Sequence, residues 1–242
     1  MRKVILIILL LVSCFGIYAQ TEFTTCLYEA NRERVIPVAV YVPSKETDKT
    51  KVVIFNHGYD QNKNIRSNQT YTYLTRFLSE KGYYVISIQH ELPDDPLLAM
   101  DEPFIKTRMP NWKRGKNNIL FTIREFKKLK PNLKWDELIM IGHSNGGDMA
   151  MLFATKHPDM VSKVISLDHR RMIIPRNRNL PVLTLRGCDY DADPNVLPTE
   201  EEQLKYPIKV IKLQGITHSN MGENGTAEQH ELINKYIYQF LK

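Results

Sequence analysis

A serine flanked by glycines follows a short apolar run in the middle of the chain. The run 138–141 leads into Gly142-His143-Ser144-Asn145-Gly146, and a helix-like stretch over 148–157 follows directly. A serine at a sharp strand-to-helix turn projects its hydroxyl above a sheet, and the glycines let the two segments pass without Cβ clashes. The following helix supplies backbone donors and partial positive charge where an oxyanion would form. The spacing therefore predicts that Ser144 is a nucleophile.

Strand-like and helix-like stretches alternate along the chain after residue 20. Residues 23–29 and 34–42 are rich in β-branched and aromatic side chains and are predicted to pair antiparallel. Helical spacing precedes Gly82 and Pro131 and closes the chain. Six short apolar runs suit strands that are buried on both faces of a parallel sheet: 52–55, 84–88, 138–141, 164–167, 182–185 and 208–211. The pattern predicts an α/β protein with a mostly parallel, doubly wound sheet, an antiparallel N-terminal strand pair and helices on both faces.

From these residues the chain resembles the α/β-hydrolase family over almost its whole length after residue 20. The resemblance implies an α/β-hydrolase fold with a catalytic triad in the chain order serine, acid, histidine. It implies Ser144 as the nucleophile and His218, which follows the last apolar run, as the general base. It also implies two backbone oxyanion donors, for which the candidates are the amides of Asn145 and of Tyr59, in the loop after 52–55.

The acid is the triad member for which the sequence departs from the usual family layout. Relatives often place it three residues after a glycine that ends the strand, and here that position, counted from Gly187, is Tyr190. We predict Asp189, because it lies nearest the end of the run 182–186 and so has the most constrained backbone. The alternatives are Asp193, Asp191 and Asp168, of which the last follows the preceding strand.

Two long connections are candidates for setting specificity. Residues 91–113 contain apolar side chains without a clear period and are predicted to line a pocket, with His90 and Trp112 as possible pocket residues. The segment 168–180, where many relatives insert a cap, is short. We therefore expect no separate cap domain.

These features predict a serine hydrolase, most simply a carboxylic ester hydrolase that forms an acyl-enzyme on Ser144. The resemblance also allows a serine peptidase, a thioesterase or an acyltransferase, and a catalytically silent binding protein is the alternative from another class. The cap-poor arrangement is similar to that of dienelactone-hydrolase-like and secreted polyester hydrolases, and the pair Gly58-Tyr59 is also similar to the latter. The expected partner is a small or polymeric ester.

Composition and missing motifs argue against other classes of function. With 242 residues, of which 43% are hydrophobic and 25% charged, the chain has the profile of one globular domain. We find no His-x-x-x-His, Cys-x-x-Cys or phosphate-binding glycine loop, and we expect no catalytic metal and no cofactor. The formal net charge of +6 includes no dense Lys/Arg block, so nucleic acid is not an expected partner. The oligomeric state stays open.

The first residues are typical of a secretory signal. Arg2 and Lys3 precede the apolar run 4–12, and small residues end at Ala19. We predict a signal peptide over 1–19, an exported α/β-hydrolase domain over 20–242 that is periplasmic or secreted, and no stable membrane span. The sequence Leu11-Val12-Ser13-Cys14 also fits a lipoprotein cleavage box, which would lipidate Cys14.

Export would bring the two remaining cysteines into an oxidising compartment. Cys26 and Cys188 could then form a single disulfide. Two buried free thiols are the alternative, because the sequence does not place the Cα atoms within bridging distance.

Overall fold

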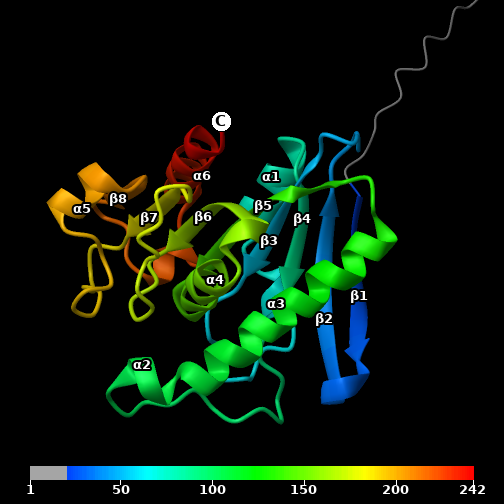
Figure 1. Cartoon of the computed structure of the whole chain (residues 1–242), viewed down its shortest axis with the longest axis horizontal. Helices are drawn as coiled ribbons and strands as arrows, with labels where there is room; N and C mark the ends of the chain where they lie inside the picture. Colours follow the sequence, from blue (N-terminus) through cyan, green and yellow to red (C-terminus); the bar gives the residue numbers. More distant parts are fainter. Residues whose placement is uncertain (1–20) are drawn as a thin grey trace, which may run out of the picture.

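The computed structural model describes residues 21–242, which form one eight-stranded sheet with helices on both faces (Figure 1). The predicted signal peptide and the lipoprotein box at Cys14 lie outside the described residues. The strands are β1 (Thr21–Glu29), β2 (Arg34–Val42), β3 (Lys51–Asn56), β4 (Tyr84–Ile88), β5 (Lys134–His143), β6 (Val161–Leu167), β7 (Val182–Arg186) and β8 (Ile208–Lys212). The helices are α1 (Thr72–Glu80), α2 (Phe104–Thr107), α3 (Met109–Leu129), α4 (Ser144–Lys156), α5 (Glu200–Lys205) and α6 (Ala227–Leu241), and short 3-10 turns include η4 (Ser219–Met221).

The strand order β1-β2-β4-β3-β5-β6-β7-β8 confirms the predicted fold class. β1 pairs antiparallel with β2, from Thr21 opposite Val42 to Glu29 opposite Arg34, and β2 pairs antiparallel with β4. All other neighbours in the sheet run parallel. The carboxyl ends of β3, β5, β6 and β7 therefore meet at one edge of the sheet, which is where open α/β sheets carry their sites.

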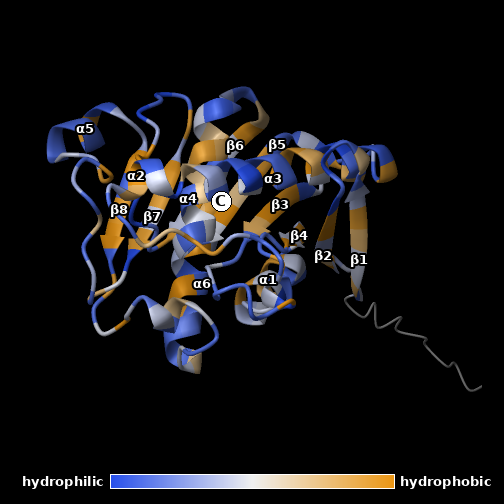
Figure 2. Ribbon diagram, turned by 90° about the horizontal axis from the view of Figure 1, so that it is seen from below, coloured by the Kyte–Doolittle hydropathy of each residue, from blue (hydrophilic) through white to orange (hydrophobic). Residues whose placement is uncertain are grey.

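Two apolar layers hold the helices against the sheet. Side chains alternate along each strand, so on β3 Val52 and Ile54 pack toward α3 and α4, whereas Val53 and Phe55 pack toward α1 and α6. Figure 2 shows the strands as mostly hydrophobic and the outer faces of the helices as mostly hydrophilic. Burial on both faces explains why the sequence of these strands reads as continuous apolar runs.

Helix α3 begins earlier than the apolar spacing of the sequence indicates. Its first turns bury Asn111, Trp112, Gly115 and Asn118, a mixture in which polar residues interrupt the hydrophobic period. The preceding residues 91–103 form no helix or strand. The irregular segment 91–113 is therefore a loop followed by the short helix α2 and the first residues of the long helix α3.

The connection 168–181 between β6 and β7 contains no helix or strand, so no cap is inserted there. Cys26 on β1 and Cys188 after β7 are unpaired and exposed, which corrects both expectations, the disulfide and the buried thiols. Five strands lie between β1 and β7, so roughly 29 Å separate the two cysteines, far beyond disulfide reach. Within residues 21–242, no helix has the length and apolar character needed to cross a membrane.

Candidate active site

Ser144 lies at the turn between β5 and α4, in the strained backbone conformation that the motif predicts. Its φ of 52° is in the left-handed region. A Cβ atom on Gly142 would come within 2.4 Å of the carbonyl oxygen of Gly146, and one on Gly146 within 2.3 Å of that of Asn56. Both positions therefore require glycine, and the tight turn lifts the Ser144 hydroxyl above the end of the sheet.

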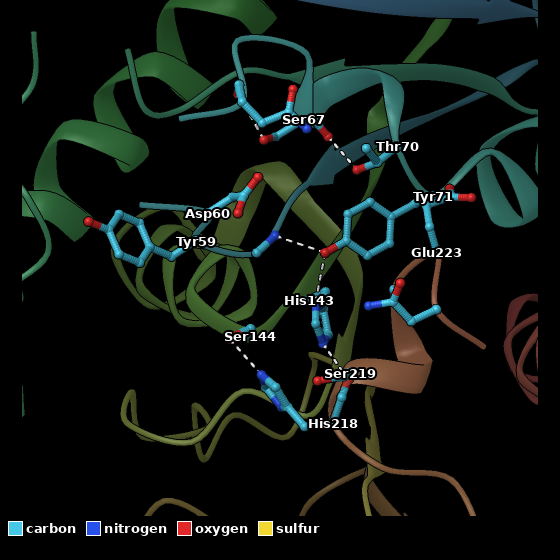
Figure 3. Close-up of a pocket in the computed structure, with 14 residues that line it drawn as sticks. Tyr59, Asp60, Ser67, Thr70, Tyr71, His143, Ser144, His218, Ser219 and Glu223 are labelled. Atoms are coloured by element: carbon cyan, nitrogen blue, oxygen red, sulfur yellow. Dashed lines mark hydrogen bonds between the residues drawn. The ribbon is translucent and has the colours of Figure 1, made fainter. Parts of the chain in front are cut away.

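A relay of hydrogen bonds connects Ser144 to an aspartate. Nε2 of His218 lies 3.0 Å from Oγ of Ser144 (Figure 3), and Nδ1 of His218 lies 2.6 Å from Oδ2 of Asp168. With Nδ1–H donating to the carboxylate, Nε2 is free to accept the hydroxyl proton of Ser144. The arrangement can therefore activate a serine nucleophile.

The carboxylate that contacts the imidazole of His218 is that of Asp168, not that of the predicted Asp189. Oδ1 of Asp189 instead accepts the backbone N–H of His218, at 2.7 Å, and so orders the loop that carries the histidine. Asp193 forms an ion pair with Arg171, and Asp191 is exposed. The prediction places the acid at the end of β7, but the carboxylate at the imidazole follows β6. The ends of these two strands lie side by side, with Leu167 opposite Leu185, so an aspartate after either strand is close to His218.

The Asp168 carboxylate is buried and held on both oxygens. Oδ1 accepts the backbone N–H of Gly187 at 3.0 Å and lies 2.9 Å from Nη2 of Arg186, whose guanidinium is also buried. Burial by itself would raise the pKa of Asp168, but the hydrogen bond from His218 and the charge of Arg186 outweigh it and lower the pKa below its ordinary value. Asp168 is therefore kept ionised.

A second chain of hydrogen bonds connects the loop after β3 to the loop of His218 (Figure 3). The N–H of Gly58 donates to the hydroxyl of Tyr71 at 3.1 Å, and this hydroxyl lies 2.7 Å from Nδ1 of His143. Nε2 of His143 lies 3.1 Å from the carbonyl oxygen of His218. In a neutral His143, Nε2–H donates to the carbonyl and Nδ1 accepts from Tyr71, so every donor has an acceptor. The chain fixes both loops relative to β5.

The two predicted oxyanion donors belong to the residue after the nucleophile and to the loop after β3. The N–H of Asn145 is in the first turn of α4, where N–H groups have no partner within the helix. Tyr59 lines the same cavity as Ser144, and its hydroxyl accepts the N–H of Leu98 at 3.1 Å, which anchors the loop. The oxyanion roles of both amides stay predictions.

His90 and Trp112, predicted as possible pocket residues, do not line this cavity. His90 is buried, with Nε2 at 2.9 Å from Oδ1 of Asn56. Trp112 is fully buried in α3, and its Nε1 donates to Oδ1 of Asn145 at 2.8 Å. No residue of 91–113 lines the cavity at Ser144, although Met109 and Lys113 line cavities elsewhere. The reason is that its apolar side chains pack on the core or lie exposed, as Leu97 does.

Comparison with known proteins identifies the family. The family model described as BD-FAE matches residues 38–173, which is more than half of the chain and includes Ser144 and Asp168. The chain belongs to the BD-FAE family. The curated "Serine hydrolase-like protein" of Mus musculus is 28% identical to this BD-FAE member over 98 residues. That alignment covers 40% of this chain and 32% of the mouse protein, so the match spans about a third of its length.

Solved structures show the same fold around the BD-FAE site. Dienelactone hydrolase from Anabaena variabilis has a TM-score of 0.61 at 17% identity, covering 91% of this chain and 96% of its own. Est1E from Butyrivibrio proteoclasticus has a TM-score of 0.60 at 15% identity, with coverage of 89% and 98%. The Pyrobaculum calidifontis esterase has a TM-score of 0.63 at 12% identity, with coverage of 91% and 84%. These similarities confirm the α/β-hydrolase fold.

The cavity beside Ser144 in this BD-FAE member is open and mostly polar, with a volume of about 370 Å³. Asp60 and Glu223 are its acidic residues, and no lysine or arginine lines it. Among residues 21–242, no group of histidine, cysteine and acidic side chains is arranged to hold a metal ion. The lining consists of Gly58, Tyr59, Asp60, Asn64, Ser67, Thr70, Tyr71, His143, Ser144, His218, Ser219, Gly222, Glu223 and Asn224.

Sequence reasoning missed two residues of the BD-FAE site, Tyr71 and Arg186. Tyr71 belongs to no motif, and its role depends on a contact with His143, 72 positions away. Arg186 did leave a signal, because a charged residue ends the apolar run 182–185. Charged side chains in buried strands are rare unless they are paired. The signal therefore pointed to a buried partner, which is Asp168.

Buried histidines make the stability of this BD-FAE member sensitive to acid. Burial lowers the pKa of His143 and of His169 to about 3, and lowers that of His90 well below its ordinary value. The unfolded chain protonates these groups near pH 6.5. The contribution of these neutral imidazoles to the unfolding free energy is therefore complete above about pH 6.5 and is lost as the pH falls toward 3. Asp148 and Glu91 act oppositely, since burial raises the pKa of Asp148 to about 6 and also raises that of Glu91, but they are two groups against three.

His169→Gln should make unfolding less dependent on pH. His169 lies outside the Ser144 relay, with Nε2 at 3.1 Å from the carbonyl oxygen of Met172, a bond that glutamine can keep. Between pH 6 and 5 we expect the variant to take up about one proton fewer on unfolding. The slope of its unfolding free energy against pH should therefore be smaller by about 1.4 kcal/mol per pH unit. Urea unfolding at several pH values measures it, with half-buried His230→Gln as the control. An unchanged slope in His169→Gln would mean that folding does not keep this imidazole neutral.

Proposed function

We propose that this protein is a serine hydrolase that cleaves carboxylic esters with the triad Ser144, His218 and Asp168. The observation that carries the proposal is the continuous relay from Oγ of Ser144 through His218 to Oδ2 of Asp168, with separations of 3.0 and 2.6 Å. A silent binding protein would have no need for a strained serine in this relay.

The relay supports a two-step reaction. Nε2 of His218 takes the proton of Ser144 as Oγ attacks the ester carbonyl carbon, and the tetrahedral oxyanion faces the amides of Tyr59 and Asn145. His218 then gives this proton to the leaving alcohol oxygen, which produces an acyl-enzyme. Water attacks the acyl carbon with His218 again as base, and the acid and the free Ser144 hydroxyl are regenerated.

The polarity of the cavity favours short, uncharged acyl groups. A long alkyl chain gains free energy only by burying its methylene groups against apolar surface, which this lining hardly offers. Asp60 and Glu223 would repel a carboxylate on the substrate. We therefore infer that small neutral esters are better substrates than long-chain or anionic ones.

A panel of p-nitrophenyl esters tests the proposed function. We expect kcat/KM to be highest for acetate and butyrate and at least about tenfold lower for octanoate and for a hemisuccinate ester, because a few mismatched methylene groups or one repelled charge cost on the order of 1–3 kcal/mol. Thioester and peptide substrates run beside the panel. Faster cleavage of a peptide than of every ester would replace the esterase proposal by a peptidase.

We also propose export after cleavage behind Ala19, on the strength of the charged and apolar segment pattern before it. The intact mass of the exported protein should correspond to a chain that begins at Gln20. A diacylated species that begins at Cys14 would contradict this and move the protein to a membrane surface.

A further inference from the structure

The side chain of Asn145, the residue after the nucleophile, is fully engaged by hydrogen bonds. Its Oδ1 accepts the indole N–H of Trp112 at 2.8 Å. Its Nδ2 donates to Oε1 of Glu91 at 3.1 Å and to Oδ1 of Asn111 at 3.0 Å. Both amide hydrogens and one oxygen lone pair are thus used, so the amide plane has one orientation.

We call Glu91, Asn111, Trp112 and Asn145 the Asn145 cluster. Their polar atoms form hydrogen bonds inside the apolar core. Their exposed fractions are 3% for Glu91, 7% for Asn111, 0% for Trp112 and 3% for Asn145. They come from three separate places, the segment after β4, the start of α3 and the start of α4. Well-packed apolar side chains usually stabilise a core as well as buried polar groups do. The cluster therefore calls for an explanation other than stability.

Glu91 also reaches the second segment that carries a candidate oxyanion donor. Its Oε2 lies 3.5 Å from Nε2 of His57, and it has no hydrogen-bond partner within residues 21–242. Nδ1 of His57 lies 2.7 Å from the carbonyl oxygen of Gly58, directly before Tyr59. Burial raises the pKa of Glu91, which favours the neutral acid in this place. The cluster thus includes the residue that carries one candidate oxyanion donor, Asn145, and it contacts His57 in the loop that carries the other, Tyr59.

We propose that the Asn145 cluster is a positioning device for the oxyanion site. With the side chain of Asn145 held at both ends, the peptide between Ser144 and Asn145 cannot rotate, and its N–H stays directed at the developing oxyanion. A misplacement of about 1 Å in such a donor can cost about 100-fold in rate. The inference rests on the proposed ester hydrolysis and assigns Trp112 and Glu91 as positioning residues in it.

A matched pair of tryptophan variants tests the proposal. Trp112→Phe removes one buried N–H···O bond and keeps the aromatic packing. Trp135→Phe makes the same change at the far end of β5, where the indole donates to the carbonyl oxygen of Lys130 at 2.8 Å and the side chain is 7% exposed. We expect kcat to fall about 10- to 100-fold in Trp112→Phe with KM within about twofold, and both constants to stay within about twofold in Trp135→Phe.

An oxyanion-mimicking inhibitor gives a readout that a purely structural role would not move. A trifluoromethyl ketone forms a tetrahedral adduct on Ser144, so its affinity should fall in Trp112→Phe by about the same factor as kcat/KM. Losses of kcat and affinity no larger than those of Trp135→Phe would overturn the proposal. An increase in KM at unchanged kcat would also overturn it.

A second pair at Glu91 keeps the proposal testable if Trp112→Phe does not fold. Glu91→Gln keeps an acceptor for Asn145 and should retain most of the turnover, whereas Glu91→Met removes it and should lower kcat at least about tenfold. Equal losses in the two variants would contradict the proposal. A parent protein that cleaves no ester would instead refute the proposed function, which separates the two failures.

Discussion

Ser144→Ala should lower ester turnover by about four orders of magnitude or more, the scale seen when the nucleophile of a triad is removed. The change deletes one half-buried hydroxyl and leaves the turn between β5 and α4 in place, so the melting temperature should barely change. The parent should also bind one equivalent of a fluorophosphonate probe, because an activated serine attacks phosphorus as it attacks a carbonyl carbon.

The matched control for this variant is Ser219→Ala, because Ser219 lines the same cavity and is not part of the relay to Asp168. It should keep turnover within about threefold and should keep probe labelling, since no hydrogen bond of the relay is lost. Labelling that persists in Ser144→Ala would show that another side chain carries the nucleophilic chemistry.

The second large effect is expected for the acid, where Asp168→Asn should lower turnover by up to about 10⁴-fold. The imidazole of His218 loses the acceptor that fixes its tautomer, and Nε2 is no longer available to take the proton of Ser144. Asp189→Asn should stay within about tenfold, because an amide oxygen can still accept the backbone N–H of His218. Steady-state kinetics near pH 8 measure both variants.

Asp168→Asn also leaves the buried guanidinium of Arg186 without its carboxylate, so its stability must be followed in parallel. Circular dichroism at the assay temperature shows whether the variant is folded. A folded Asp168→Asn with nearly normal turnover, beside an inactive Asp189→Asn, would return the acid role to the loop after β7.

The elements that carry the candidate nucleophile and base were predictable because their sequence signals are local. Continuous apolar runs marked the parallel strands, and the segment Gly142–Gly146 combined a strand end, a turn and a helix start within five residues. The position of His218 followed from the last apolar run, 208–211, together with the chain order of the family. These signals need no knowledge of how distant segments meet.

The acid was not predictable with the same certainty, because it depends on the relation between two strands. Asp168 and Asp189 follow neighbouring parallel strands, and both side chains reach His218, one at the ring and the other at the backbone. The local backbone conformation determines which of the two carboxylates faces the imidazole. The left-handed φ of 52° at Asp168 cannot be read from the sequence. A charged pair at two adjacent strand ends, Asp168 and Arg186, was the available clue.

Trp112 was misread for a different reason. Indole side chains are frequent in ligand pockets, and an aperiodic segment gave no indication of which face of α3 it lies on. In the structure the ring packs in the core and only its N–H is used, toward the residue after the nucleophile. Sequence patterns indicate well which large apolar side chains are buried. They do not show which hydrogen-bond partner the one polar atom of such a side chain has.

The hydrogen-bond chain from Gly58 through Tyr71 and His143 to the carbonyl oxygen of His218 contains no side chain that changes charge over a wide range of pH. Burial holds the pKa of His143 at about 3 and raises that of Tyr71 above its ordinary value, so neither group changes charge between about pH 4 and 9. The two loops thus keep one spacing while His218 gains and loses protons during turnover. A rate profile measured across this range reports proton transfer within the relay, rather than movement of the loops that frame it.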